Sequence, residues 1–181
     1  MFRSSQRRDL SYVGHLRGYQ DISESTNIDL GASFAHGHNP SGVVNEIDLG
    51  RYTTNLFGVD ATLRWRPLQR AIYHSFVGRS EVVWSRRNQP DGRQTASGFY
   101  LSGDYQMGRR WLTGLRFDRS ARSDAASMRD SGRSLTVTYV PSEFSQIRGQ
   151  VRRTKYAEGI TANEFLFQFQ FSIGAHGAHP F

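Results

Sequence analysis

The chain has 181 residues, with 23 Lys and Arg against 16 Asp and Glu, and therefore a formal net charge of +7. It contains no Cys, which excludes a disulfide framework, a Cys-based zinc site, an iron–sulfur cluster and a thiol nucleophile. No run of 18 apolar residues occurs, so we expect no transmembrane helix.

Hydrophobicity alternates with a period of two along most of the chain, which is the signal of a β-strand. The first segment is diluted by Gly14 and Gly18, and the last, EFLFQFQFSIG, is the strongest. Nine segments show the alternation: 12–19, 28–35, 57–66, 74–85, 99–106, 111–118, 135–140, 146–152 and 164–174. We predict an all-β, antiparallel protein with eight or nine strands here and no helix to cover them.

The two faces of these predicted strands differ in composition. One face carries large aromatic side chains on nearly every strand, and several segments reach the length of about ten residues that a tilted strand needs to cross a bilayer. The other face carries the charges Asp29, Asp60, Arg64, Arg79, Glu81, Asp104, Arg116, Asp118, Arg148 and Arg152. This contrast predicts a transmembrane β-barrel rather than a soluble β-sandwich, which also alternates and remains an alternative.

The predicted connections alternate in length. The short ones are 21–27, 67–70, 108–110 and 141–144, and the long polar ones are 36–53, 86–97, 119–133 and 155–163. Short periplasmic turns and long outer loops give a barrel this rhythm. Aromatic residues near the strand ends are expected to form girdles at the two membrane interfaces: Trp65, Tyr73, Trp84, Tyr105, Trp111, Tyr139 and Tyr156.

The end of the chain carries a resemblance. An alternating closing strand with a terminal aromatic residue resembles the signature that the barrel-assembly machinery reads: Phe165, Phe167, Phe169, Phe171 and Phe181. The ending GAHGAHPF, with FLFQFQFSIG and YVPSEFSQIR before it, is similar to proteobacterial outer-membrane proteins described as zinc-regulated TonB-dependent receptors or porin-like proteins. The resemblance implies a barrel in the outer membrane. The plug domain and TonB box of such a receptor are not recognisable in this chain.

The beginning of the chain, MFRSSQRRDL, has no apolar stretch behind its arginines and is not a signal peptide. With Phe181 in the periplasm, nine strands put the N-terminus outside the cell, whereas single-chain bacterial barrels have even strand numbers. We therefore expect residues 1–10 to be the remnant of an outer loop and residues 11–181 to be part of a larger, N-terminally truncated barrel of a Gram-negative bacterium. The alternative is an eight-stranded barrel with a filled interior.

Charged side chains on the polar face are the candidate pore-lining residues. Rows of opposite charge across a constriction sort ions, although the same residues could simply pair across strands and hold the wall together. With Arg66 included, six arginines on this face stand against five carboxylates, and this excess of positive charge predicts a slight anion preference. The candidates are Asp60, Arg64, Arg79, Glu81, Asp104, Arg116, Asp118, Arg148 and Arg152.

A metal site is a second candidate. His36 and His38 lie two apart in HGHNPSG and would bind zinc if Glu46 or Asp48 came close. Otherwise we expect no cofactor. His176 and His179 form a similar pair at the other end of the chain. The motifs GxSxG, HExxH, GxGxxG and the P-loop are absent, so we expect no enzyme.

Basic pairs such as 86–87, 109–110 and 152–153 lie at strand ends or in connections. This placement favours outer-membrane lipid and lipopolysaccharide as partners. Nucleic acid is not expected, because aromatic and basic residues fall on opposite faces. The expected function is passage or uptake of a small solute or ion, linked to zinc. The alternatives are a structural or adhesive barrel without an open pore and a soluble β-sandwich binding module.

Overall fold

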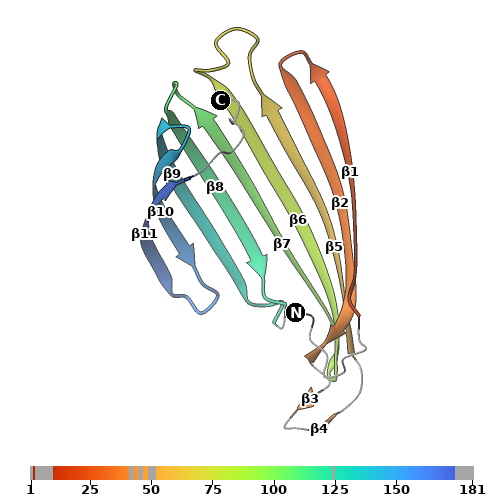
Figure 1. Ribbon diagram of the computed structural model, residues 1–181. Coiled ribbons are helices and arrows are strands. Elements are labelled where there is room, and N and C mark those ends of the chain that lie inside the picture. Colours follow the sequence, from red (N-terminus) through yellow and green to blue (C-terminus); the bar gives the residue numbers. More distant parts are fainter. Residues whose placement is uncertain are drawn as a thin grey trace.

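The structure, a computed structural model, describes residues 10–40, 52–123 and 125–173, together with residue 2 and the backbone of 43–44 and 47–48. Nine strands form one antiparallel sheet in the order β1-β2-β5-β6-β7-β8-β9-β10-β11, so each strand pairs with its neighbour in the sequence (Figure 1). The strands are β1 (Tyr12–Ser23), β2 (Thr26–Asn39), β5 (Tyr52–Trp65), β6 (Ser75–Gln89), β7 (Gly92–Gln106), β8 (Trp111–Ala121), β9 (Arg129–Ser142), β10 (Ser145–Lys155) and β11 (Thr161–Phe171).

All nine predicted strands are present, including the weakly patterned first one, and the all-β antiparallel prediction is confirmed. The sheet is not closed, because β1 and β11 lie at its two edges. A short pair that the pattern did not predict, β3 (Val43–Val44) and β4 (Ile47–Asp48), lies in the connection from β2 to β5. Among the described residues, no helix is long and apolar enough to cross a membrane.

Two predicted connections differ from the structure. The expected long loop 86–97 is a continuation of β6 and β7, joined by a tight turn at Pro90 and Asp91. Polar residues in this stretch suggested a loop, yet Asn88 pairs with Arg93, and Gly92 takes the positive φ of 122° that the turn requires. The expected short turn 67–70 lies in the longer connection 66–74. The regular alternation of short and long connections is therefore wrong in these two places.

The register keeps every strand in phase, so one face is apolar across the whole sheet. Phe34 lies opposite Phe57, and Phe57 lies opposite Trp84. On the same face, nearer the β11 edge of the sheet, Leu135 lies opposite Leu115 and Val151. This phase matters because a slip by one residue would exchange the two faces of a strand.

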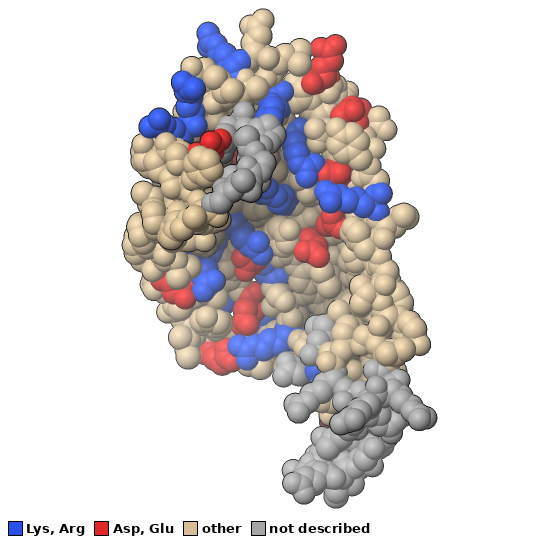
Figure 2. Space-filling model, viewed as in Figure 1, with Lys and Arg blue, Asp and Glu red and all other residues tan. Residues whose placement is uncertain are grey.

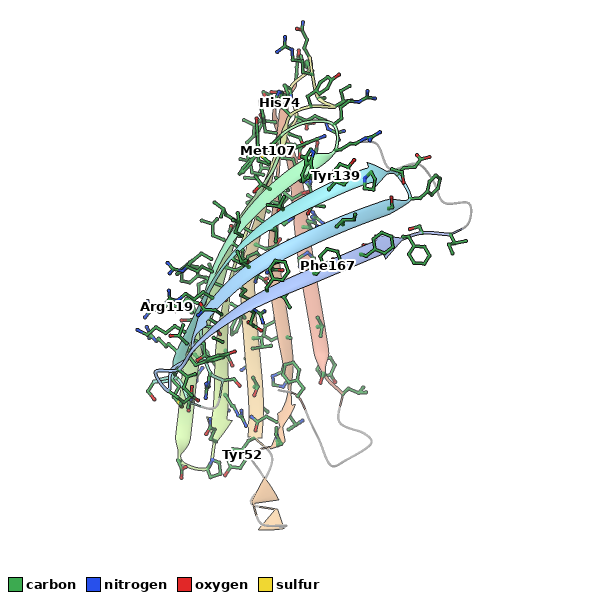
Figure 3. The ribbon with its side chains drawn as sticks, turned by 90° about the vertical axis from the view of Figure 1, so that its left-hand side faces the viewer. Tyr52, His74, Met107, Arg119, Tyr139 and Phe167 are labelled. Carbon is green, nitrogen blue, oxygen red and sulfur yellow. The ribbon has the colours of Figure 1, made fainter. Side chains whose placement is uncertain are left out.

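The described residues leave the apolar face of the sheet uncovered. Ala96 is the one buried apolar side chain among the described residues, whereas Leu115 is 66% and Phe167 is 68% exposed. In Figure 3, which faces the β8–β11 side of the sheet, Phe167 lies on β11 with no second layer of the described chain over it. A continuous exposed apolar surface of this kind marks an interface with a membrane or a partner.

Aromatic residues on this face form two bands, each toward one end of the strands. The band toward the upper end in Figure 1 contains Trp65, Phe76, Tyr105, Trp111, Tyr139 and Phe169, and the lower band contains Phe34, Phe57, Trp84, Phe99, Phe117 and Phe165. The side chains between the bands are aliphatic or small on most strands, and Phe167 lies between them on β11. The predicted girdle residues Trp65, Trp84, Tyr105, Trp111 and Tyr139 all belong to them, whereas Tyr73 and Tyr156 lie in connections.

The lower band runs obliquely to the register. Phe99 is opposite Val82, two residues from Trp84, and Phe117 is opposite Leu101, one further step of two. Following the register from Phe165 back to β6 reaches Gly78, six residues from Trp84 across five pairs of strands. At about 3.3 Å per residue and 4.8 Å per strand, a level band requires strands tilted by about 40°. Strands of membrane barrels tilt by about 35–45°.

Candidate functional site

The second face of the sheet carries the charged residues, and it is hollowed. Figure 2 shows Lys, Arg, Asp and Glu side chains gathered in the hollow between the two edges of the sheet. The register places these charges in three adjacent rows that run across the strands. We call this set the charged belt: Arg17, Asp29, Asp60, Arg64, Arg79, Glu81, Asp104, Arg116, Asp118, Arg152 and Glu164.

Eight of the nine predicted pore-lining residues belong to the charged belt. The exception is Arg148, which lies one row outside it and donates a hydrogen bond from Nε to Oγ1 of Thr138 at 3.0 Å. Two residues of the belt, Arg17 and Glu164, were not among the predicted pore-lining residues. Both share the parity of the polar face, but Arg17 lies on the weakly patterned β1, and Glu164 precedes the run of phenylalanines.

Ion pairs join the strands of the belt. Asp29, which is 5% exposed, accepts hydrogen bonds from Arg17 at 2.8 Å and from Arg64, and so links β1, β2 and β5. Arg79 and Asp104 link β6 to β7 at 2.6 Å. The Arg116 guanidinium on β8 lies 4.1 Å from the centre of the Tyr100 ring on β7, and it contacts Asp118 of its own strand at 3.2 Å. Arg152 on β10 contacts Glu164 on β11 through two nitrogens at 2.7 and 2.9 Å.

Glycines on the neighbouring strand let the aspartates lie flat against the sheet. Asp118 is opposite Gly132, and a Cβ at that glycine would be 2.7 Å from Oδ2 of Asp118. Asp60 lies in the same way over Gly31, and Asp104 over Gly114. A larger residue at any of these glycines would push a carboxylate away from the wall, so the glycines shape the belt without carrying a charge.

The charge of the belt differs from the charge of the chain. Five arginines face six carboxylates, and each of the arginines has a carboxylate partner. Asp60 and Glu81 lie directly opposite each other and form no ion pair with any described residue. The belt is therefore slightly acidic, in contrast with the sequence-based count of its face. Arg148 and Arg66 lie outside the belt, whereas Arg17 and the carboxylate of Glu164 belong to it.

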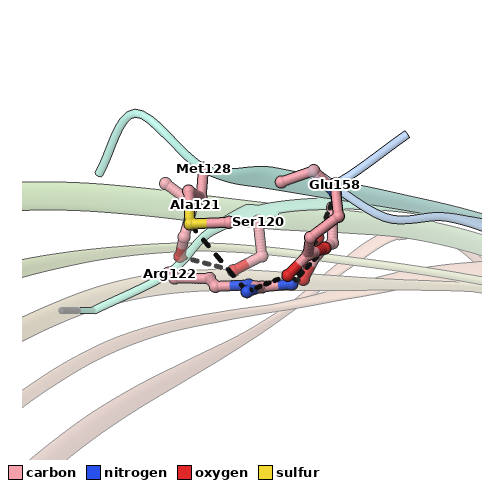
Figure 4. Close-up of polar contacts among 7 residues, drawn as sticks. Ser120, Ala121, Arg122, Met128 and Glu158 are labelled. Atoms are coloured by element: carbon pink, nitrogen blue, oxygen red, sulfur yellow. Dashed lines mark hydrogen bonds and ion pairs between the residues drawn. The ribbon is translucent and has the colours of Figure 1, made fainter. Parts of the chain in front are cut away.

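A second polar cluster lies at the lower end of the sheet (Figure 4). Arg122, in the connection between β8 and β9, contacts Glu158 in the connection between β10 and β11 at 2.5 Å and Asp130 at 3.3 Å. Asp130 also accepts a hydrogen bond from the backbone N–H of Ala157 at 2.8 Å. The hydrogen bond from Arg122 holds the pKa of the Glu158 carboxyl below its ordinary value. This cluster ties two neighbouring connections together.

The predicted zinc ligands His36 and His38 lie on one face of β2. Nδ1 of His36 is 2.6 Å from Oδ1 of Asn55, its partner on β5. The side chains of Glu46 and Asp48, the suggested third ligands, lie outside the described residues, as do His176 and His179. The described part of the chain contains no group of three His, Asp or Glu side chains that could hold a metal ion, so the zinc site stays a prediction.

Four of the five residues of the predicted assembly signal lie on the apolar face of β11. Phe165, Phe167, Phe169 and Phe171 are each 59–73% exposed, and the rings of the last two are 5.8 Å apart. Phe181 lies outside the described residues, as do most of residues 1–10.

Comparison with known proteins gives little beyond the sequence itself. An uncharacterized protein from Aquifex aeolicus is 29% identical over 197 residues, which cover 94% of this chain and 40% of that protein. The chain therefore spans less than half the length of this relative. No family model matches the chain, and no solved structure matches it.

Proposed function

We propose that this sheet forms part of the wall of a transmembrane β-barrel in the outer membrane of a Gram-negative bacterium. The observation that carries the proposal is the single-layered, two-faced sheet, with an exposed apolar face between two aromatic bands and a charged face in the hollow. The oblique bands, which correspond to strands tilted by about 40°, support it. The soluble sandwich is disfavoured, since no second sheet covers the apolar face among the described residues.

The free edges of β1 and β11 bear on how such a barrel closes. An exposed edge presents a row of unpaired N–H and C=O groups, which a membrane does not tolerate. We propose that further strands pair with both edges, and the greater length of the Aquifex aeolicus relative supports this. Only the resemblance of the end of the chain supports a TonB-dependent receptor or a porin-like protein.

We further propose that the barrel passes a small solute or ion, and that the charged belt sets its selectivity. On β5, β6 and β7 the belt lies between the two aromatic bands, whereas Asp118, Arg152 and Glu164 lie just beyond the lower band. Charges at a constriction between low-dielectric walls act strongly on a passing ion. The carboxylates of Asp60 and Glu81, which have no arginine partner, give it a weak preference for cations. Zinc binding by His36 and His38 is a separate proposal, and it requires a third ligand from elsewhere in the protein.

Conductance in planar bilayers tests this function. The wild-type protein is expected to conduct with a reversal potential that indicates weak cation preference, and Asp60→Asn is expected to move it toward anions. Asp91→Asn, in the exposed turn between β6 and β7, is the matched control and should leave it unchanged. A protein that inserts but never conducts would instead support a structural or adhesive barrel, a role that the cross-strand ion pairs of the belt also suit.

A further inference from the structure

The apolar face also carries a group of basic residues at its lower end. On β8, β9 and β10, the aliphatic and aromatic side chains of this face give way to basic side chains toward the lower end of each strand. All of these basic side chains are exposed. Figure 3 shows Arg119 at this end, far from His74 and Met107 at the other. We call these residues the outer basic patch: Arg119, Arg129, Arg133, Arg153 and Lys155.

The register brings these cations together without a carboxylate. Arg133 lies directly opposite Arg153, and Ser131 lies between Arg119 on one side and Lys155 on the other. Like charges placed opposite each other on one face destabilise a sheet unless an anion separates them. None of the five forms an ion pair with a described residue.

The carboxylates of these strands are already engaged on the other face or in the connections. Asp118 contacts Arg116, Glu164 contacts Arg152, and Arg122 contacts both Asp130 and Glu158. The outer basic patch therefore has an excess of positive charge that the described residues of the chain do not neutralise. An anion from outside the chain would complement it.

Two grooves at the patch indicate the shape of that anion. A groove of about 250 Å³ is lined by Arg133, Arg153 and Lys155, together with Ser131 and Thr161. A second groove of about 540 Å³ shares Arg133 and Arg153 and continues along the aliphatic side chains of Leu115, Leu135 and Val151. A charged recess that opens into an apolar groove suits a phosphate group attached to an acyl chain.

We propose that the outer basic patch binds the phosphates of lipid A in lipopolysaccharide, with an acyl chain in the neighbouring apolar groove. The inference rests on the proposed function, which puts this face in the lipid, and on the predicted outer loops 36–53, 86–97, 119–133 and 155–163, which place the lower end at the outer leaflet. Arg133 and Arg153 hold a phosphate between them, since guanidinium groups form charge-assisted hydrogen bonds with phosphate oxygens. Lys155 and Arg119 add attraction at the rim.

The test is titration of the full chain in a non-ionic detergent with bisphosphorylated lipid A, compared with the same lipid after both phosphates are removed. The double variant Arg133→Gln/Arg153→Gln is expected to weaken binding of lipid A by at least about tenfold. Arg109→Gln/Arg110→Gln removes the same charge at the other end of the sheet and should change binding by less than about twofold. Inorganic phosphate alone should compete only at millimolar concentration or above.

Several results would overturn the inference. These are equal binding of the dephosphorylated lipid, an equal loss in both double variants, or inorganic phosphate that competes as well as lipid A does. Heat-modifiable migration on gels checks that each variant is folded. A variant that folds and conducts normally but still binds lipid A would contradict this inference alone, whereas a wild-type chain that needs no detergent would contradict the proposed function as well.

Discussion

Arg152 and Arg153 are neighbours in the sequence but lie in opposite environments. Arg152 points into the hollow and holds Glu164 through two nitrogens, at 2.7 and 2.9 Å. Arg153 points to the apolar face, opposite Arg133, with no carboxylate among the described residues. The charged belt therefore satisfies its cations within the chain, whereas the outer basic patch does not. This difference indicates that the two faces meet different surroundings.

The largest expected effect comes from placing a charge on the apolar face between the two aromatic bands. Leu135→Arg should destabilise the folded protein in a bilayer by about 2–4 kcal/mol, since the charge would contact lipid. Gln150→Arg is the control, because Gln150 faces the hollow one strand away. Urea titration of folding into vesicles measures both variants. Equal losses would show that the two faces do not differ in their surroundings.

A smaller effect is expected in the charged belt. Asp29→Asn removes the carboxylate that Arg17 and Arg64 share, and should cost about 1–2 kcal/mol, since both arginines are about half exposed. Asp91→Asn serves as the comparison, because that carboxylate is exposed in a turn. Denaturation in detergent micelles measures the two. No difference between them would mean that the belt does not bind the strands together.

The glycines of the belt offer a finer test. Gly132→Ala would place a methyl group 2.7 Å from Oδ2 of Asp118, so the carboxylate must move and its contact with Arg116 weakens. We expect a loss of about 1 kcal/mol. Gly149→Ala, on the next strand, meets no atom within 4 Å and should have little effect. Thermal unfolding of the two variants compares them, and a larger loss in the control would contradict the packing described for Asp118.

The smallest effect is a pH dependence at the lower end. The pKa of Glu158 is lowered by its hydrogen bond from Arg122, so the contact is present above the ordinary value of 4.5 and is lost as the pH falls through the lowered value. Hydrogen exchange at the 122–128 and 156–160 connections should increase in that acidic range. In Glu158→Gln the exchange should already be faster at neutral pH. Exchange that does not depend on pH in the wild-type protein would argue against this contact.

Alternation in the sequence was enough to predict all nine strands and both faces. The reason is physical: a period of two fixes the side of the sheet for every residue once a segment is a strand. Phe34 and Phe57 could thus be placed on one face, and Asp60 and Arg79 on the other.

The concentration of charges into three rows was not predictable, because it depends on the register between strands. The sequence of β8 alone does not say that Asp118 faces Gly132, or that Arg116 shares a row with Arg152. The extended hairpin of β6 and β7 was missed for a related reason. Polar residues such as Arg86 and Asn88 look like a loop until their cross-strand partners are known.

The most direct test of the central claim is a labelling scan of β9. The chain has no Cys, so single cysteines at positions 134–139 can each carry a nitroxide label without interference. In reconstituted bilayers, labels at 135, 137 and 139 should be accessible to oxygen dissolved in the lipid, and labels at 134, 136 and 138 to a water-soluble nickel complex. Accessibility that does not alternate, or that alternates in the opposite sense, would contradict the assignment of the apolar face to lipid.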